Sequence, residues 1–392
     1  MLPNFEAVVT ANNPDKNSCD GRKWKPDISV YEKKTFVSKA GEPVTENIMQ
    51  FDKVELPHEI KPDGVPKPFS DPPPKSTSES PKRQHVFQTD GSDATVIRGQ
   101  LISVMTEMCA RQHRLHAFMV YLNATEVRFL RADRSGLVVS EAINYRKNSQ
   151  ILAEFYLRFN KLSREERGWD PTVEVAPDNS QTTKAKEKLK PFCVRPELST
   201  KERHLHIITI PGVNREHDRK VYTYHSLSDP ESLTGRATRG YPAYDSDNDK
   251  VCFLKDMWRN EGLEGEYNIL EYLNGKGVPH IPTVLAGGDV PGTGQTTRTQ
   301  EFVNESWVLG KVGSEDYEGL DCRVHHRLLE NFIPHRIWDC INAKDMIAVV
   351  YHAFLGKLLL THSFLPMADS AQRTRRPMPL DTFIGISVTG ML

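Results

Sequence analysis

The sequence predicts an α+β protein with two domains, and three observations support this. The chain has 392 residues, which is long enough to form two hydrophobic cores. Apolar residues recur with the period of strands in some stretches and with the period of helices in others. Two polar stretches separate these patterns, a proline-rich one over 62–95 and a second over 171–200. We expect the first to be a disordered insertion and the second to be a linker.

The N-terminal domain is predicted to combine residues 1–61 with residues 96–170. Alternating apolar and polar residues indicate a strand over 51–60. From Ile97 onward, apolar residues fall on one face of a helix. Three strands and a second amphipathic helix are expected to follow, at 116–122, 126–131, 137–140 and 151–159. These elements predict a mixed α/β domain.

The second domain is predicted to span residues 201–360. Its strand patterns lie at 204–210, 220–225, 241–244, 251–255, 282–286 and 324–333. One helix is expected at about 263–274 and a longer one at 343–360, after the last strand. Residues 361–392 lose the helical period, so we expect an atypical tail there.

Composition excludes several classes of protein. Lys and Arg number 51 against 52 Asp and Glu, so the chain has no general attraction to nucleic acid or to anionic membranes. The six cysteines form no Cys-x-x-Cys pair, which argues against a zinc site and against a disulfide framework. The N-terminus lacks the profile of a signal peptide, and the longest apolar stretch is too short to cross a bilayer. We therefore expect an intracellular protein, in the cytoplasm or nucleus.

A glycine motif, a lysine and a glutamate follow one another in the second domain. Gly235 and Gly240 fit a glycine-rich phosphate loop in which Ala237 replaces the central glycine. Glycines there let backbone N–H groups approach phosphates, although such a motif alone is more often a surface turn. Lys255 closes an apolar strand, where a lysine can pair with the phosphates of a nucleotide. Glu266 lies on the predicted helix that follows, and such a glutamate orients the lysine.

Glu264 is the rival of Glu266 for this role. We favour Glu266 because Ile269 and Leu270 follow it at helical spacing and supply a buried face.

The chain resembles the fungal-type protein kinase family over roughly residues 20–355. In the second domain the resemblance lies in LTGRATRG (233–240), FLKDMWR (253–259), EGE (264–266), VPHIP (278–282) and GGDV (287–290). In the N-terminal domain it lies in RGQL (98–101), ARQHR (110–114) and RADRSG (131–136).

The resemblance implies a kinase-like small lobe followed by part of a large lobe. It also implies ATP and Mg²⁺ as cofactors and phosphoryl transfer to a protein. The implied ATP-binding residues are Gly235, Gly240, Lys255 and Glu266.

Two catalytic motifs of such kinases do not occur in this sequence. A His-Arg-Asp loop supplies the catalytic base, and an Asp-Phe-Gly motif holds Mg²⁺. The chain has only Thr361-His362-Ser363 and Asp381-Thr382-Phe383 in the corresponding region. We therefore expect a truncated, pseudokinase-like chain with impaired or absent catalysis. The helix at 343–360 is expected to leave apolar side chains exposed.

Two other functions remain open. Asp27 after Pro26, then Glu59 and Lys61, resemble the PD-(D/E)xK nuclease superfamily, with Gln100 on the following helix. In such sites two carboxylates bind Mg²⁺ and the lysine orients a water molecule. Alternatively, the chain is a non-catalytic interaction module. We assign no metal to the histidines at 113, 116, 325 and 326.

Overall fold

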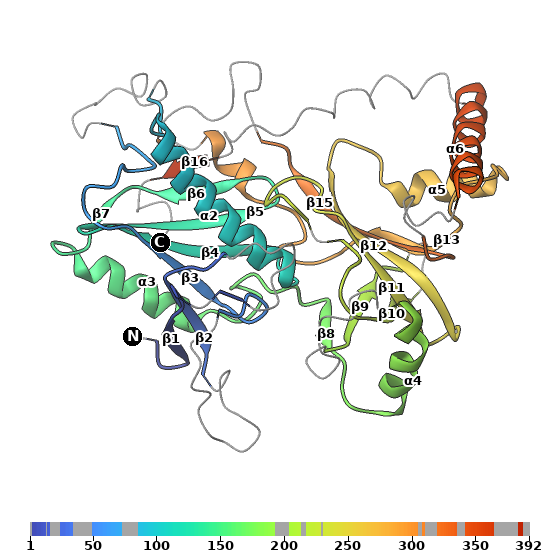
Figure 1. Ribbon diagram of the computed structural model, residues 1–392, viewed down its shortest axis with the longest axis horizontal. Coiled ribbons are helices and arrows are strands. Elements are labelled where there is room, and N and C mark those ends of the chain that lie inside the picture. The colour runs from blue at the N-terminus through green and yellow to red at the C-terminus, as the bar shows by residue number, and fades with distance from the viewer. Residues whose placement is uncertain are drawn as a thin grey trace.

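The computed structural model describes residues 2–12, 14–15, 24–33, 49–72, 85–192, 204–212, 217–228, 230–304, 308–309, 320–334, 342–363 and 383–386. These residues form two β-sheets, which lie next to each other with helices packed on both (Figure 1). The predicted mixture of helices and strands is therefore confirmed.

The first sheet belongs mainly to the N-terminal part of the chain. Its order is β1-β2-β3-β4-β5-β6-β16-β14, with β7 paired to β5. The strands are β1 (Phe5–Val9), β2 (Ile28–Glu32), β3 (Leu56–Ile60), β4 (His116–Leu122), β5 (Glu126–Asp133), β6 (Leu137–Ser140), β7 (Ile143–Asn144), β14 (Val308–Leu309) and β16 (Phe383–Ile386). β3 runs parallel to β4, and β16 runs parallel to β6.

One helix covers each face of the first sheet. The helices are α2 (Ser92–Arg111) and α3 (Ser149–Lys161). Because successive strand residues point to opposite faces, Met119 of β4 packs with Leu101 of α2, whereas Val120 packs with Phe159 of α3. Two apolar layers result, one on each side of the sheet.

The second sheet is antiparallel throughout, in the order β13-β15-β12-β11-β10-β9-β8. Its strands are β8 (Val173–Val175), β9 (His206–Ile210), β10 (Arg219–Thr223), β11 (Arg239–Asp245), β12 (Lys250–Asn260), β13 (Val284–Asp289) and β15 (Arg323–Glu330). The sheet curls, so that β9 contacts β13 and β15 and an apolar core fills the inner face. The helices α4 (Ser180–Leu189) and α5 (Glu266–Gly275) pack on the outer face.

The predicted disorder over 62–95 is wrong for the described parts of that stretch. Phe69 pairs with Gln88 in a β-bridge, and the buried rings of Phe69 and Phe87 stack with centroids 5.2 Å apart. Arg98 of α2 also donates a hydrogen bond to the Pro68 carbonyl. The two aromatic rings bury enough apolar surface to order chain that looks polar by composition. Residues 73–84 lie outside the described residues.

The polar stretch over 171–200 also differs from the expected linker. It contains β8 and α4, which begins where the Asn179 side chain accepts a hydrogen bond from the Thr182 N–H. Ala185 and Leu189 are the buried residues that attach this otherwise charged helix to the second sheet. Residues 193–200 lie outside the described residues.

The last helix, α6 (Ala343–Ser363), carries the exposed apolar side chains that the sequence predicted. Ile347 is 65% exposed and Phe354 is 59% exposed. The expected atypical tail, 361–392, falls largely outside the described residues, apart from the end of α6 and β16.

Candidate functional site

Lys255 and Glu266 form an ion pair on the outer face of the second sheet. The Lys255 Nζ lies 2.5 Å from Glu266 Oε1, and each side chain keeps about a quarter of its surface exposed (24% and 28%). Glu266 is the first residue of α5, so the short connection after β12 brings it directly over the lysine. Glu264 instead accepts a hydrogen bond from Asn268. The structure thus joins Lys255 to Glu266 and not to its rival.

A chain of polar contacts fixes the start of α5. Arg259 of β12 donates two hydrogen bonds to Asp289 of β13, at 2.7 and 2.5 Å. Asp289 Oδ1 lies 2.8 Å from His326 Nδ1, and His326 Nε2 accepts the Tyr267 N–H. Because Nε2 is an acceptor, the neutral ring carries its proton on Nδ1 and donates it to Asp289. Burial lowers the pKa of His326, which favours this neutral form.

Gly265 precedes α5 and lies directly against the His326 ring. A Cβ at this position would approach His326 Cε1 to 3.0 Å. Below the helix, Leu328 of β15 packs against Tyr267 and Leu270. The orientation of Glu266 therefore depends on a polar anchor at the helix start and an apolar one beneath it.

The glycine motif divides into a loop residue and a strand residue. Gly235 has a φ of 95°, a conformation that favours glycine, in the connection between β10 and β11. Gly240 lies inside β11 directly opposite Lys255. A Cβ on Gly240 would fall 2.4 Å from Phe253 Cζ, so the phenyl ring occupies this space. Gly240 therefore has a packing role beside the lysine.

The connection that contains Gly235 is attached to the N-terminal part of the chain. The Gly235 N–H donates to the Arg134 carbonyl, and Arg134 Nη1 donates back to the Leu233 carbonyl, both at 2.9 Å. The Leu233 side chain is buried in the core of the first sheet. On its other side, Arg236 reaches Glu266 Oε2 at 3.4 Å. The loop therefore connects the first sheet to the Lys255–Glu266 pair.

The inner face of the second sheet carries a buried charged cluster. Asp256 contacts His325 and Arg327, and Arg327 Nη2 donates to Asp170 Oδ2 at 2.7 Å. Burial alone would raise the pKa of Asp256, but His325 and Arg327 reverse this effect and lower it. The groups of this cluster therefore stabilise one another in a buried environment.

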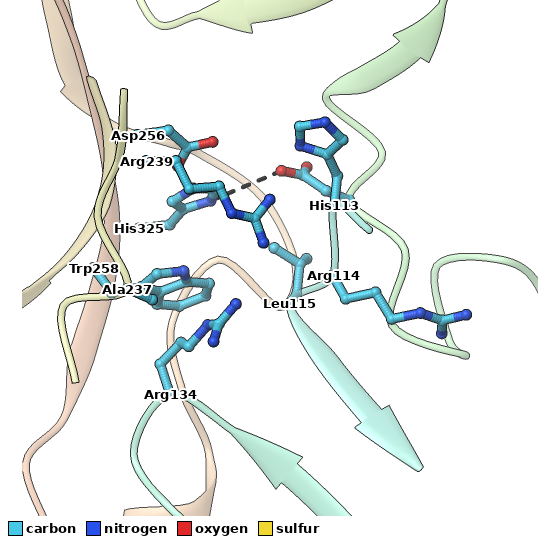
Figure 2. Close-up of a pocket in the computed structure, with 10 residues that line it drawn as sticks. His113, Arg114, Leu115, Arg134, Ala237, Arg239, Asp256, Trp258 and His325 are labelled. Atoms are coloured by element: carbon cyan, nitrogen blue, oxygen red, sulfur yellow. Dashed lines mark hydrogen bonds and ion pairs between the residues drawn. The ribbon is translucent and has the colours of Figure 1, made fainter. Parts of the chain in front are cut away.

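A small cavity of about 20 Å³ lies beside this cluster, between the two sheets. Figure 2 shows Arg134 and Arg239 directed toward this space, with His113 across it. Arg239 Nη2 donates to the carbonyls of Cys109 and Gln112 at the end of α2. The cavity therefore marks a polar contact between the first sheet's helix and the second sheet.

The structure also brings together the three residues of the nuclease-like motif. Asp27 Oδ2 accepts the Ile60 N–H at 2.7 Å, and Lys61 Nζ lies 2.5 Å from Glu59 Oε1. Burial raises the pKa of Glu59, Lys61 opposes this, and the charge of Asp27 adds to it. Gln100 lies on α2, where its Oε1 is buried and accepts no hydrogen bond from the described residues.

Sequence reasoning missed His326, Asp289 and Arg259 as supports of the site, and it missed the Asp256 cluster. The two-residue period of a strand could have revealed both groups. In β15, His325 and Arg327 belong to one face, and His326 and Leu328 belong to the other. Reading charged residues by face would have separated the two groups.

The structure also shows the surroundings of His113 and His116, to which the sequence analysis assigned no metal. The half-buried His113 ring lies 5.2 Å from the His206 ring, and His116 Nε2 lies 3.1 Å from the Glu166 carbonyl oxygen. Among the described residues, no three His, Cys, Asp or Glu side chains gather as they would around a metal ion. Within the same residues, no helix has the length and apolarity needed to cross a membrane.

The comparison with protein-family models shows the family of the chain. The order of a strand lysine and a helix glutamate in the second sheet is the order found in kinase small lobes. The family model for fungal protein kinases matches residues 85–362, well over half of the chain. The chain therefore belongs to the fungal protein kinase family. No curated protein and no solved structure matches it significantly.

Proposed function

We propose that the outer face of the second sheet binds ATP at Lys255. The observation that carries this proposal is the 2.5 Å ion pair between Lys255 Nζ and Glu266 Oε1. A lysine held in this way presents its ammonium group to the α- and β-phosphates of a nucleotide. Both side chains stay partly exposed, so a ligand can reach them.

The connection around Gly235 is proposed to contact the phosphates from above. Gly235 has a left-handed φ there, and since its own N–H donates to the Arg134 carbonyl, the N–H groups of its neighbours would be the ones to meet the anion. Gly240 contributes indirectly, because its missing side chain makes room for Phe253 beside the lysine.

Mg²⁺ enters this proposal only as the counter-ion that the nucleotide brings. In the part of the chain that the structure describes, no three His, Cys, Asp or Glu side chains gather as they would around a metal ion. Mg²⁺ commonly depends on the phosphates of its substrate for much of its coordination.

Phosphoryl transfer to a protein is the activity that the family implies, and we propose that it is impaired in this chain. The 392 residues include no His-Arg-Asp string and no Asp-Phe-Gly string. These 392 residues therefore supply neither the usual base for the acceptor hydroxyl nor the usual Mg²⁺ ligands. The proposed function is therefore nucleotide binding of the pseudokinase type.

A thermal-shift titration with ATP, with and without Mg²⁺, tests this proposal. A ligand that binds only the folded state raises its stability in proportion to ln(1 + [L]/Kd). We expect a shift in the wild type and in Lys250→Ala, an exposed lysine of the same strand, and its loss in Lys255→Ala. Absence of a shift in folded wild type would favour the interaction-module alternative.

A second candidate function is Mg²⁺-dependent nucleic-acid cleavage at Asp27, Glu59 and Lys61. It is favoured by the convergence of these residues where β2 begins and β3 ends. Asp27 and Glu59 would hold the ion, and Lys61 would orient a water molecule after leaving Glu59. Cleavage of DNA or RNA that needs Mg²⁺ and is lost in Lys61→Ala, but kept in Lys53→Ala, would support it. Equal cleavage by both variants would exclude it.

A further inference from the structure

The cavity of about 20 Å³ between the two sheets has buried arginine side chains in its wall. Arg134 belongs to the turn between β5 and β6, and Arg239 is the first residue of β11. Their exposed fractions are 3% and 7%, so bulk water solvates neither guanidinium group well. Figure 2 shows both side chains directed into the cavity. The cavity therefore has two positive charges at its wall.

The charge of Arg134 is not matched by a carboxylate in contact with it. Its Nη1 atom donates to the Leu233 carbonyl, and among the described residues no carboxylate lies within ion-pair distance of its guanidinium group. Asp170 and Asp256, the acidic residues of the cavity wall, both contact Arg327 instead. An arginine stays protonated in proteins, and burying a charge without a counter-charge is costly. A small anion in the cavity would supply that counter-charge.

The pKa shifts of two groups in the wall agree with this interpretation. Burial lowers the pKa of Arg134, and the positive charge of Arg239 lowers it further, whereas Asp256 opposes both effects. Burial also lowers the pKa of His113, and the charges of His206 and Arg239 add to this effect. Positive groups thus repel one another around this cavity, and an anion between them would relieve the repulsion.

The size of the cavity limits the ligand to a very small ion. A water molecule needs about 10–15 Å³ of such space, so a cavity of about 20 Å³ holds a single particle of roughly that size. Chloride is only slightly larger than water, whereas phosphate and organic carboxylates consist of several atoms and do not fit. Leu115 and Trp258 add apolar surface to the wall, which suits a weakly hydrated halide.

We propose that this cavity binds a chloride ion, which pairs with the guanidinium groups of Arg134 and Arg239. The half-buried His113 ring lies across the cavity and offers a further N–H donor in its neutral form. The ion joins three segments: the end of α2, to whose carbonyls Arg239 donates, the turn after β5, and Ala237 in the connection between β10 and β11. This site is separate from the candidate nucleotide site and does not depend on it.

Exchange of the anion tests the proposal on the full chain. Thermal midpoints are measured in sodium chloride and in sodium gluconate at the same ionic strength, because gluconate is too large for the cavity. Chloride that binds only the folded protein raises its stability, so the midpoint should be about 2–4 °C higher once chloride exceeds its Kd about fivefold. Equal midpoints in the two salts would mean that water alone occupies the cavity.

Two buried arginines provide a matched pair of variants. Arg134→Met removes a proposed ligand, and its midpoint should differ by less than about 1 °C between the two salts. Arg98→Met removes a buried arginine that also donates to backbone carbonyls, about three turns earlier on α2 than the end near the cavity. This control should lose stability but keep the wild-type effect of chloride. A chloride effect that survives in Arg134→Met overturns the proposal.

Bromide quenching gives a measurement that does not depend on the arginine variants. Trp258 lines the cavity and is 4% exposed, so bromide in bulk solvent hardly reaches it. Bound bromide, a heavy halide that quenches tryptophan on contact, should cause a saturable loss of fluorescence that added chloride reverses. This saturable loss should disappear in Trp258→Phe. A purely linear bromide response in the wild type, or a saturable one that persists in Trp258→Phe, would exclude a halide from this cavity.

Discussion

Lys255 and Asp256 are consecutive residues of β12 that engage different partners on opposite faces of the second sheet. Lys255 pairs with Glu266 of α5 on the outer face. Asp256 pairs with His325 and Arg327 on the inner face. Because a strand alternates its side chains, one short segment both carries the candidate nucleotide site and ties the sheet to the charged cluster. Substitutions of Lys255 and of Asp256 should therefore have effects that can be measured separately.

Removing the charge of Asp256 should destabilise the fold. In Asp256→Asn, the buried Arg327 guanidinium loses part of its compensation and the His325 ring loses a charged partner, at a cost of about 3–5 kcal/mol in unfolding free energy. Urea denaturation followed by circular dichroism measures this change. Asp247→Asn, at an exposed turn residue, is the matched control and should stay within about 0.5 kcal/mol of wild type. Equal stability of both variants would contradict the role of the cluster.

Glu266 and Glu264 should differ in their effect on ATP binding. Glu266→Gln removes the ion pair that orients Lys255, and we expect a loss of about tenfold in ATP affinity. Glu264→Gln changes a side chain that accepts a hydrogen bond from Asn268 and does not pair with Lys255. The ATP affinity of this variant should therefore match that of the wild type. Calorimetric titration distinguishes the two, and the reverse order of effects would restore Glu264 as the partner.

His326 should influence the site without contacting ligand. His326→Phe keeps an aromatic ring but cannot accept the Tyr267 N–H, so the first turn of α5 loses its anchor. We expect weaker ATP binding by about three- to tenfold and faster amide hydrogen exchange at Tyr267. Slow exchange at Tyr267 in this variant would show that the helix start does not depend on the histidine.

Acidification should act on the fold partly through His58. Burial lowers the pKa of His58 from 6.5 to about 4 in the folded state, where its ring lies 2.8 Å from the Tyr156 hydroxyl. Between these values the unfolded chain binds more protons, so the contribution of His58 is present above pH 6.5 and is lost as the pH falls toward 4. His58→Gln should therefore lose less thermal stability than wild type between pH 7 and pH 5.

His217→Gln is the matched control for that experiment, because His217 is exposed. It should follow the wild-type pH dependence. Parallel pH profiles for wild type and His58→Gln would mean that the histidine is charged in the folded protein.

The sequence predicted helices and strands best where apolar residues keep the same spacing over several residues. The strand at 116–122 has the observed bounds, and the helix expected from Ile97 begins at Ser92. The strand expected over 51–60 begins only at Leu56, because Phe51 and Val54 enter the core from an irregular segment. Apolar alternation cannot distinguish these two ways of burying a side chain.

The candidate site was predictable in part. Lys255 and Glu266 stand out because a lysine that ends an apolar strand and a glutamate that starts a helix are unusual neighbours. The supports of this pair, Arg259, Asp289 and His326, could not be found in this way, since they meet only when β12, β13 and β15 pair in the folded sheet. Likewise, the ordered structure of residues 62–72 depends on a contact between Phe69 and Phe87, which are well separated in the sequence.

The burial of Leu233 in the core of the first sheet limits how the gene for this protein can recombine. A gene fragment that encoded only the second sheet would carry Lys255 and Glu266 but would leave the Gly235 connection without its support from Arg134. Recombination at the polar stretch between the two sheets would thus separate the candidate nucleotide site from the part of the chain that supports its loop. Selection should therefore keep the two parts of the chain together, as one evolutionary unit rather than two exchangeable modules.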